Sequence, residues 1–184
     1  MLSKEKLRKK FLLIRKNRYF EIDKNFFNPF IRVINPKLKK KKIILSSYFP
    51  SSYEVDVLKI YETNIVKKLK ILYPRVKKDN EMSFYNWDKN DVLQINQFGI
   101  LEPIENKRSV IPDVMLIPLL AFDKFNNRLG YGKGYYDNYL NKYLKLNKGI
   151  LTIGVGFSFQ KYNKLPSYKN DVKLDYILTE KGLS

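Results

Sequence analysis

Residues 112–140 constrain this chain more than any other stretch, because they join a buried strand to a helix through a glycine loop. Val114–Ile117 is an uninterrupted apolar run between Pro112 and Pro118, which predicts a strand covered on both faces, as in a parallel sheet. After a polar loop, glycine occupies every second position over residues 130–134, which frees the backbone for positive φ and for close approach of a ligand. A strand, a glycine loop that contains a lysine, and a helix start together indicate a cradle for an anion.

The helix after the loop is predicted from Tyr135, Tyr139 and Tyr143, which repeat every four residues. Alternate glycines can also form a plain surface turn, but large aromatic residues follow these at once, and Arg128 and Lys133 lie close by. The spacing matches neither the Gly-x-x-x-x-Gly-Lys-Ser/Thr loop nor the dinucleotide fingerprint. By itself it therefore indicates a phosphate site without naming the ligand.

The composition excludes several kinds of chemistry. The 184 residues contain no cysteine and no histidine, so disulfides, thiolate metal sites and histidine bases are absent. Catalysis would have to use carboxylates, lysine, arginine, tyrosine and backbone groups, which favours phosphoryl transfer, where positioning and charge neutralisation matter most. The length predicts one domain over residues 1–184. Neither a membrane span nor a signal peptide is expected, so the prediction is a cytoplasmic protein.

The net charge of +18 is compatible with a nucleic-acid-binding module, and this alternative stays open. The lysines are spread along the chain, however, apart from the run Lys37–Lys42. Such a module would also explain neither the buried strands nor the glycine loop. We therefore expect no specific binding of nucleic acid, and a basic surface that steers polyanions toward the protein.

Hydrophobic periodicity predicts alternating helices and strands along the rest of the chain. Helices are expected over Lys4–Arg18 with Ser3 as the N-cap, Asp23–Ile34, Glu54–Leu72 and Tyr136–Leu146. Further strands are expected over Ile43–Leu45, Leu72–Val76, Met82–Tyr85, Gly149–Gly156 and Leu174–Thr179. This order predicts a single three-layer α/β domain with a mostly parallel central sheet flanked by helices, and a ligand crevice at the carboxyl ends of the strands.

Several motifs resemble those of the 5-formyltetrahydrofolate cyclo-ligase (methenyltetrahydrofolate synthetase) family. Residues 127–137 read Asn-Arg-Leu-Gly-Tyr-Gly-Lys-Gly-Tyr-Tyr-Asp, and the Gly-Tyr-Tyr-Asp ending is highly specific to the signature of that family. Further matches are Lys-x-x-Leu-Arg at residues 4–8, Phe-Gly-Ile-x-Glu-Pro at 98–103 and Leu-Pro-x-x-x-Asn-Asp-Val-x-Leu-Asp at 165–175. The matches follow the order of the family and span nearly the whole chain.

The resemblance implies an enzyme that uses ATP and Mg²⁺ to convert 5-formyltetrahydrofolate, with or without a polyglutamate tail, into 5,10-methenyltetrahydrofolate, ADP and phosphate. The implied path passes through a phosphorylated formyl group, an iminium phosphate. A monomer is expected. Another phosphate-binding α/β transferase, such as a kinase-like or coenzyme A-transferring enzyme, would explain the glycine loop but not the other motifs.

The same resemblance implies roles for individual residues. The catalytic cations would be Lys4, Arg8, Arg128 and Lys133, and the Mg²⁺ ligands Asp137 and Asp171. The ATP contacts would be Lys4, Arg8, Arg128, Leu129, Gly130, Tyr131, Gly132, Lys133, Gly134, Tyr135 and Tyr136. The folate contacts would be Phe49, Glu54, Met82, Phe98, Tyr131, Gly132, Lys133, Gly134 and Tyr135.

Each of these roles has a plain structural alternative. By pattern alone, Lys4 and Arg8 fit a basic surface helix equally well, and Glu54 fits the first turn of a helix, where a carboxylate offsets the dipole. Methionine and aromatic residues near Met82 suit a core. Two carboxylates about thirty residues apart imply no metal site until a fold brings them together.

Tyr131 departs from the family pattern, in which arginine commonly stands between the first two glycines. A phenol supplies neither a cation nor a bidentate fork. We therefore expect Lys133 to carry more of the ATP interaction than in arginine-containing relatives. The sequence also predicts that Tyr131→Arg is tolerated and partly rescues Lys133→Ala.

Overall fold

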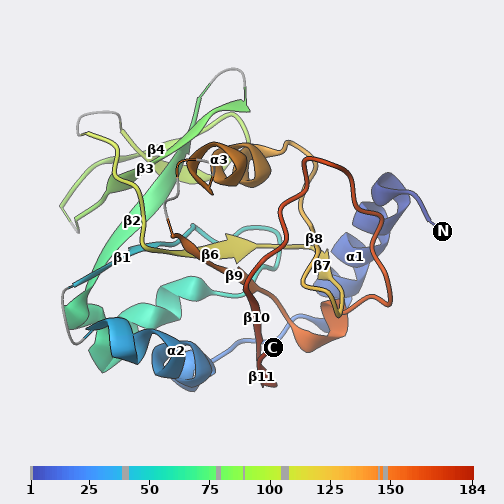
Figure 1. The fold of residues 1–184 in the computed structure, drawn as a ribbon, viewed down its shortest axis with the longest axis horizontal. Helices are drawn as coiled ribbons and strands as arrows, with labels where there is room; N and C mark the ends of the chain where they lie inside the picture. The colour runs from blue at the N-terminus through green and yellow to red at the C-terminus, as the bar shows by residue number, and fades with distance from the viewer. Residues whose placement is uncertain are drawn as a thin grey trace.

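The computed structural model describes residues 2–38, 42–77, 80–88, 90–104, 108–144, 146 and 149–184. Its centre is a seven-stranded sheet in the order β11-β10-β9-β6-β1-β2-β3 (Figure 1). The parallel strands are β10 (Tyr176–Thr179), β9 (Leu151–Val155), β6 (Val114–Pro118), β1 (Ile43–Ser46) and β2 (Leu69–Val76). Antiparallel strands form the two edges, namely β3 (Met82–Asn86) and β11 (Gly182–Leu183).

Helices cover both faces of this sheet, which confirms the predicted three-layer α/β architecture. The helix α2 (Asn28–Leu38) lies on one face and α3 (Tyr135–Leu144) on the other (Figure 1). On the central strand β6, Val114 and Leu116 pack in the core on the α2 side, whereas Met115 and Ile117 pack in the core on the α3 side. The strand is therefore buried on both faces, as its apolar run predicts.

The N-terminal helix α1 (Lys4–Arg18) lies beside a small hairpin of β7 (Ala121–Phe122) and β8 (Arg128–Leu129) (Figure 1). Ser3 caps the helix as predicted, because its side chain accepts a hydrogen bond from a first-turn backbone N–H at 3.3 Å. Leu7 in α1 packs against the hairpin in a separate apolar cluster. This packing places the start of α1 next to the segment that leads into the glycine loop.

The predicted helix over Glu54–Leu72 is wrong. Two 3-10 helices, η2 (Val57–Glu62) and η3 (Asn64–Lys68), occupy its middle part, and β2 begins directly after them. Thr63 separates the two with extended backbone, and its hydroxyl donates to a carbonyl of the preceding turn at 2.6 Å. Residues 69–71 then alternate buried, exposed and buried while pairing with β1, so their period is two and not 3.6.

The second predicted helix begins as a 3-10 turn, η1 (Lys24–Phe27), before α2. Pro29 stands in the first turn of α2, where its missing N–H needs no partner. The other short elements are β4 (Leu93–Ile95), β5 (Leu101–Pro103) and η5 (Ser158–Gln160). The middle of the lysine run over residues 37–42 lies outside the described residues.

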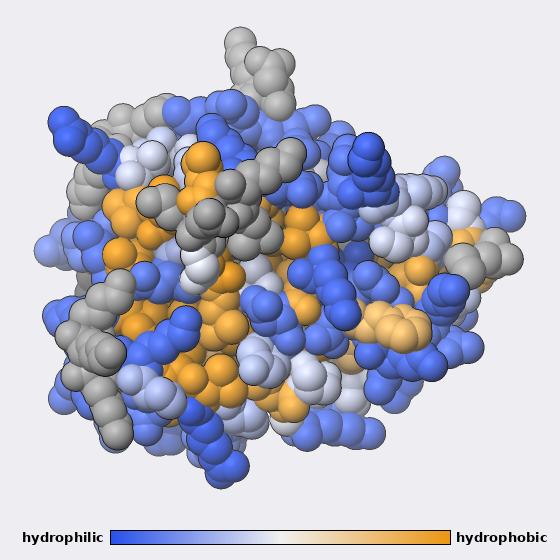
Figure 2. All heavy atoms as spheres, viewed as in Figure 1, coloured by the Kyte–Doolittle hydropathy of each residue, from blue (hydrophilic) through white to orange (hydrophobic). Residues whose placement is uncertain are grey.

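Hydrophilic side chains cover much of the face seen in Figure 2, and apolar side chains gather in its left and central part. The chain carries 36 lysine and arginine residues against 18 aspartate and glutamate residues, which accounts for the hydrophilic character of the surface. Within the described ranges, no helix combines the length and the apolar character that crossing a membrane requires.

Candidate active site

A cavity of about 590 Å³ lies at the carboxyl ends of the central strands. It is lined by Phe49 just after β1, by Val76 at the end of β2 and by Pro118 at the end of β6. The strands β1 and β6 are neighbours, yet the chain proceeds from β1 to β2 on one side and from β6 to β9 on the other. Such a reversal of strand order is where open α/β sheets bind ligands, so the cavity lies where the sequence predicts the crevice.

All the residues that were given a role from the sequence line this one cavity. They are Lys4, Arg8, Phe49, Glu54, Met82, Phe98, Arg128, Leu129, Gly130, Tyr131, Gly132, Lys133, Gly134, Tyr135, Tyr136, Asp137 and Asp171. They come from α1, the loop after β1, β3, the turn between β4 and β5, β8, the glycine loop with the start of α3, and the segment before β10. The fold thereby joins residues as far as 167 positions apart.

Two of the alternate glycines make room for arginine side chains of the protein itself. A methyl group at Gly130 would lie 2.7 Å from Nη1 of Arg128, and one at Gly132 would lie 3.0 Å from Cζ of Arg8. Arg8 also donates from Nε to the Gly130 carbonyl at 3.0 Å. Positive φ occurs at Gly132 (101°) and Gly134 (75°) but not at Gly130, so that expectation is wrong for the first glycine.

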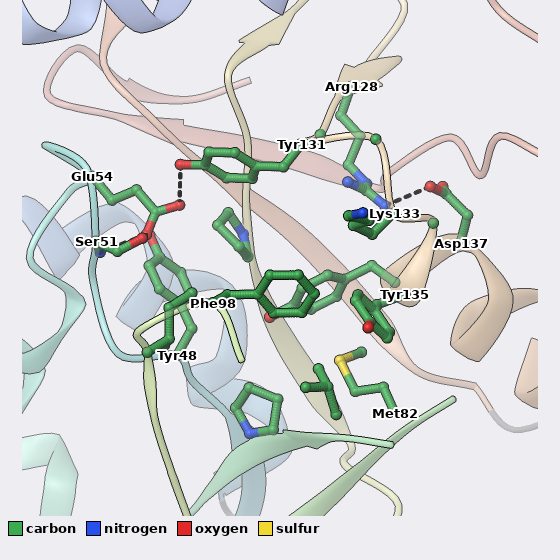
Figure 3. A pocket seen from close by; sticks show the side chains of 18 of the residues that line it. Tyr48, Ser51, Glu54, Met82, Phe98, Arg128, Tyr131, Lys133, Tyr135 and Asp137 are labelled. Carbon is green, nitrogen blue, oxygen red and sulfur yellow. Dashed lines mark hydrogen bonds and ion pairs between the residues drawn. The ribbon is translucent and has the colours of Figure 1, made fainter. Parts of the chain in front are cut away.

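Both predicted metal carboxylates are paired with cations. Lys4 Nζ lies 2.5 Å from Oδ2 of Asp171. Arg128 Nη2 lies 2.9 Å from Oδ2 of Asp137, as Figure 3 shows. The other Asp137 oxygen accepts a hydrogen bond from the backbone N of Val172 at 3.1 Å, which holds the segment that carries Asp171 against α3. The two carboxylates and the two cations therefore form one charged group, which defines one end of the cavity.

Glu54 lies in the loop between β1 and η2, and not at the start of a helix as predicted. Its buried carboxylate accepts hydrogen bonds from the backbone N of Ser51 at 2.8 Å and from the Tyr131 hydroxyl at 2.6 Å (Figure 3). Burial raises the pKa of Glu54, although the Tyr131 hydrogen bond and the positive charge of Arg15 both lower it. The result is a desolvated acceptor at the edge of the cavity.

Apolar side chains form the cavity wall at the end where Glu54 lies. Phe49 stacks on an aromatic ring of β2 with the centroids 4.2 Å apart, and Met82 is buried nearby. Phe98, in the turn between β4 and β5, lies 6.0 Å from the Tyr135 ring and is 42% exposed. Lys133 Nζ lies 5.9 Å from the Phe98 ring, so the cationic and apolar parts of the cavity meet here.

Two further acidic residues, Glu102 and Asp123, have structural roles. Glu102 accepts a hydrogen bond from the backbone N of Val76 at 3.1 Å and one from the side chain of Gln94 at 2.8 Å, which fastens the β4–β5 hairpin to β2. Asp123 accepts from N–H groups of its own hairpin turn and from the backbone N of Leu165 at 3.0 Å. These carboxylates shape the cavity without lining it.

Arg15 received no role from the sequence, yet it is 1% exposed and donates a hydrogen bond to the Tyr131 hydroxyl. A usable signal was present, since Leu7, Phe11 and Arg15 are four residues apart and so share the buried face of α1. The charge conceals the signal, because an arginine is seldom buried completely.

The family model for the 5-formyltetrahydrofolate cyclo-ligase family matches residues 1–180. The 5-formyltetrahydrofolate cyclo-ligase of Mycoplasma pneumoniae is 32% identical over 160 residues, which cover 86% of this chain and 85% of that protein. The protein of the same name from Haemophilus influenzae is 37% identical over 114 residues, or 60% of this chain and 59% of that protein. The structure of Aquifex aeolicus 5,10-methenyltetrahydrofolate synthetase is similar with a TM-score of 0.75 and 33% identity, over 99% of this chain and 92% of that one. The chain therefore belongs to the 5-formyltetrahydrofolate cyclo-ligase family.

Proposed function

We propose that this protein catalyses the ATP-dependent cyclisation of 5-formyltetrahydrofolate to 5,10-methenyltetrahydrofolate, with release of ADP and phosphate. The observation that carries the proposal is a single cavity with two chemically different ends. A folate ring suits the apolar end, where Glu54 can accept hydrogen bonds from ring N–H groups. A triphosphate suits the glycine loop with its arginine and lysine side chains, and membership of the family supports the same assignment.

The chemistry follows from the substrate. The formyl oxygen is amide-like and is a poor leaving group until it is phosphorylated. When it attacks the γ-phosphate, ADP leaves and an iminium phosphate forms. N10 then attacks the activated carbon, the ring closes, and the oxygen departs with the phosphate. The protein must align this transfer, neutralise the triphosphate and exclude water.

Four cations are available for that neutralisation, namely Lys4, Arg8, Arg128 and Lys133. The side chain of Arg128 is 5% exposed, and its buried Nε has no hydrogen-bond partner within the described ranges. A buried guanidinium with an unused donor suits a phosphate oxygen, because hydrogen bonds between charged groups are the strong ones.

Asp137 and Asp171 fit Mg²⁺, which takes hard oxygen ligands and commonly uses one or two carboxylates with phosphate oxygens and waters. When bound, the ion would neutralise charge on the β- and γ-phosphates. Among the described residues, no group of three or more acidic side chains could hold a metal by itself. Since Lys4 and Arg128 now occupy the two carboxylates, we propose that nucleotide and metal enter together, as the cations turn to phosphate.

The first prediction tests the activity. Protein mixed with Mg-ATP and 5-formyltetrahydrofolate should form the methenyl product, which is followed by its absorbance. Omission of ATP, or addition of EDTA, should abolish the product, because phosphorylation activates the formyl oxygen and the metal neutralises the triphosphate. Turnover that EDTA leaves undiminished would remove the metal from the proposal, and absence of product under every condition would refute the function.

The second prediction tests the exchange of ion pairs, with Mn²⁺ as a paramagnetic probe in place of Mg²⁺. Binding to the protein alone should be weak, and a non-hydrolysable ATP analogue should tighten it by at least about tenfold, because phosphate releases the carboxylates from their cations. Lys4→Met should tighten binding without nucleotide, since it frees Asp171, whereas Lys6→Met on the same helix should not. Tight binding by the wild type without nucleotide would contradict the exchange.

A further inference from the structure

Arg15 is a buried cation that the proposed chemistry does not use. Its guanidinium donates from Nε to the Ser52 carbonyl at 3.0 Å, from Nη1 to the Leu119 carbonyl at 3.2 Å, and from Nη2 to the Tyr131 hydroxyl. These partners lie in the loop after β1, just beyond β6 and in the glycine loop, so one side chain of α1 connects three segments around the cavity. Such a set of contacts fixes the guanidinium in one place.

The donor and acceptor rules give the contact with Tyr131 a direction. A guanidinium can only donate, so the Tyr131 oxygen must accept from Arg15. The single hydroxyl hydrogen is then left for Glu54, whose Oε1 lies 2.6 Å from the Tyr131 oxygen (Figure 3). The result is a series of two hydrogen bonds, from Arg15 to Tyr131 and from Tyr131 to Glu54. It also directs the Tyr131 hydroxyl toward Glu54 and away from Arg128 and Asp137 (Figure 3).

We propose that Arg15 is a positioning residue of the folate subsite, which acts through the Tyr131 hydroxyl to hold Glu54 as a charged acceptor aimed at the substrate ring. The inference rests on the proposed function, because it assigns a purpose to the carboxylate in that subsite. Arg15 itself lies behind the cavity wall and does not touch the cavity. Its effect on the substrate therefore passes through Tyr131 and Glu54.

The electrostatic surroundings of Glu54 support this role. Burial raises the pKa of the carboxyl, while hydrogen bonds from Tyr131 and Ser51 and the charge of Arg15 oppose that rise. The other titratable groups that face it, Tyr48 and Tyr136, keep their protons, because burial raises their pKa values well above the ordinary value. Arg15 is therefore the cation that favours the ionised form of Glu54 from within the protein.

The experiment compares Arg15→Met, Tyr131→Phe and the double variant, with Arg18→Met as the matched control. Arg18 lies on the same helix but stacks on Phe159, outside the cavity. Each of the first two changes should raise KM for the folate about tenfold or more and leave KM for ATP near its wild-type value, because only the folate end loses a charge-assisted contact. Arg18→Met should change neither constant.

The pH profile separates this role from a merely structural one. Loss of the hydrogen bonds that link Arg15 through Tyr131 to Glu54 should shift the acid limb of kcat/KM for the folate upward by about one pH unit, since Glu54 would protonate more easily. If Arg15 acts through the phenol, its removal should have little further effect in the Tyr131→Phe background. Arg15→Met/Tyr131→Arg should recover part of the folate affinity, because a cation is again supplied near Glu54.

The outcomes are distinct from those of the activity test. A wild type that neither binds 5-formyltetrahydrofolate by calorimetry nor turns it over would overturn both proposals. A wild type that does so, with variants whose acid limb and folate KM are unchanged, would overturn the role of Arg15 alone. If Arg15→Met does not fold, Tyr131→Phe decides, because it breaks this series of hydrogen bonds and leaves the Ser52 and Leu119 contacts of Arg15 in place.

Discussion

Gly132→Ala should lower kcat/KM for ATP by roughly 100-fold or more while the protein stays folded. The φ of 101° at Gly132 is strained for a residue with a Cβ, at a cost of about 1–3 kcal/mol. The new methyl would also lie 3.0 Å from Cζ of Arg8, so that the guanidinium would have to shift and its hydrogen bond to the Gly130 carbonyl would weaken. Loss of a charge-assisted contact adds about 1.5–3 kcal/mol. The measurements are steady-state kinetics with varied ATP and a thermal melt.

Gly149→Ala is the matched control for this change. Gly149 has ordinary φ, and a methyl group there would meet nothing within 4 Å. Its kinetics should therefore equal those of the wild type. Wild-type kcat/KM for ATP in Gly132→Ala would contradict the importance of the backbone conformation at this position for ATP binding.

Lys133→Ala should lower kcat/KM for ATP by about tenfold to a hundredfold, as expected when a charge-assisted contact to phosphate is lost. Lys133 lines the cavity, is exposed there and forms no ion pair among the described residues, so its charge is available to a ligand. The Tyr131 hydroxyl lies with Glu54 and Arg15, which leaves Lys133 as the cation of the Gly-Tyr-Gly-Lys-Gly loop itself. Steady-state kinetics with varied ATP measure the effect.

Lys142→Ala, which removes a charge from the outer part of α3, serves as the control and should leave the kinetics unchanged.

The sequence alone suggests that Tyr131→Arg would partly rescue Lys133→Ala. The structure leads us to expect no rescue, because the new guanidinium would lie beside Arg15 and Glu54 and not at the phosphate end. A nearly silent Lys133→Ala, or a clear rescue by Tyr131→Arg, would contradict this account of the loop.

Local signals were sufficient for most elements of the fold. The apolar run Val114–Ile117 between two prolines became the central strand β6, and Ser3 capped a helix with the predicted ends. For residues 54–72 the same local signals led to a wrong helix, because short apolar segments fit a helical and an extended period equally well. Pairing with β1 decided in favour of the strand for its last part, and pairing is not a local property.

The residues that line the cavity could be named from the sequence only because the motifs resemble a known family, and their partners in ion pairs and hydrogen bonds were not predictable at all. From the sequence, Asp137 and Asp171 are two carboxylates, whereas in the structure each already holds a cation. Glu102 was left without a role and proves to fasten a hairpin.

The sequence alone was enough to predict the central strand β6, the capped helix α1 and the absence of histidine and cysteine chemistry. Periodicity, caps and composition are local, so they can be read without a fold. Only the tertiary structure decided that Lys4 meets Asp171 and that Arg15 reaches Glu54 through Tyr131. These contacts join residues 167 and 116 positions apart, and they exist because parallel strand pairing brings the loops at one edge of the sheet together.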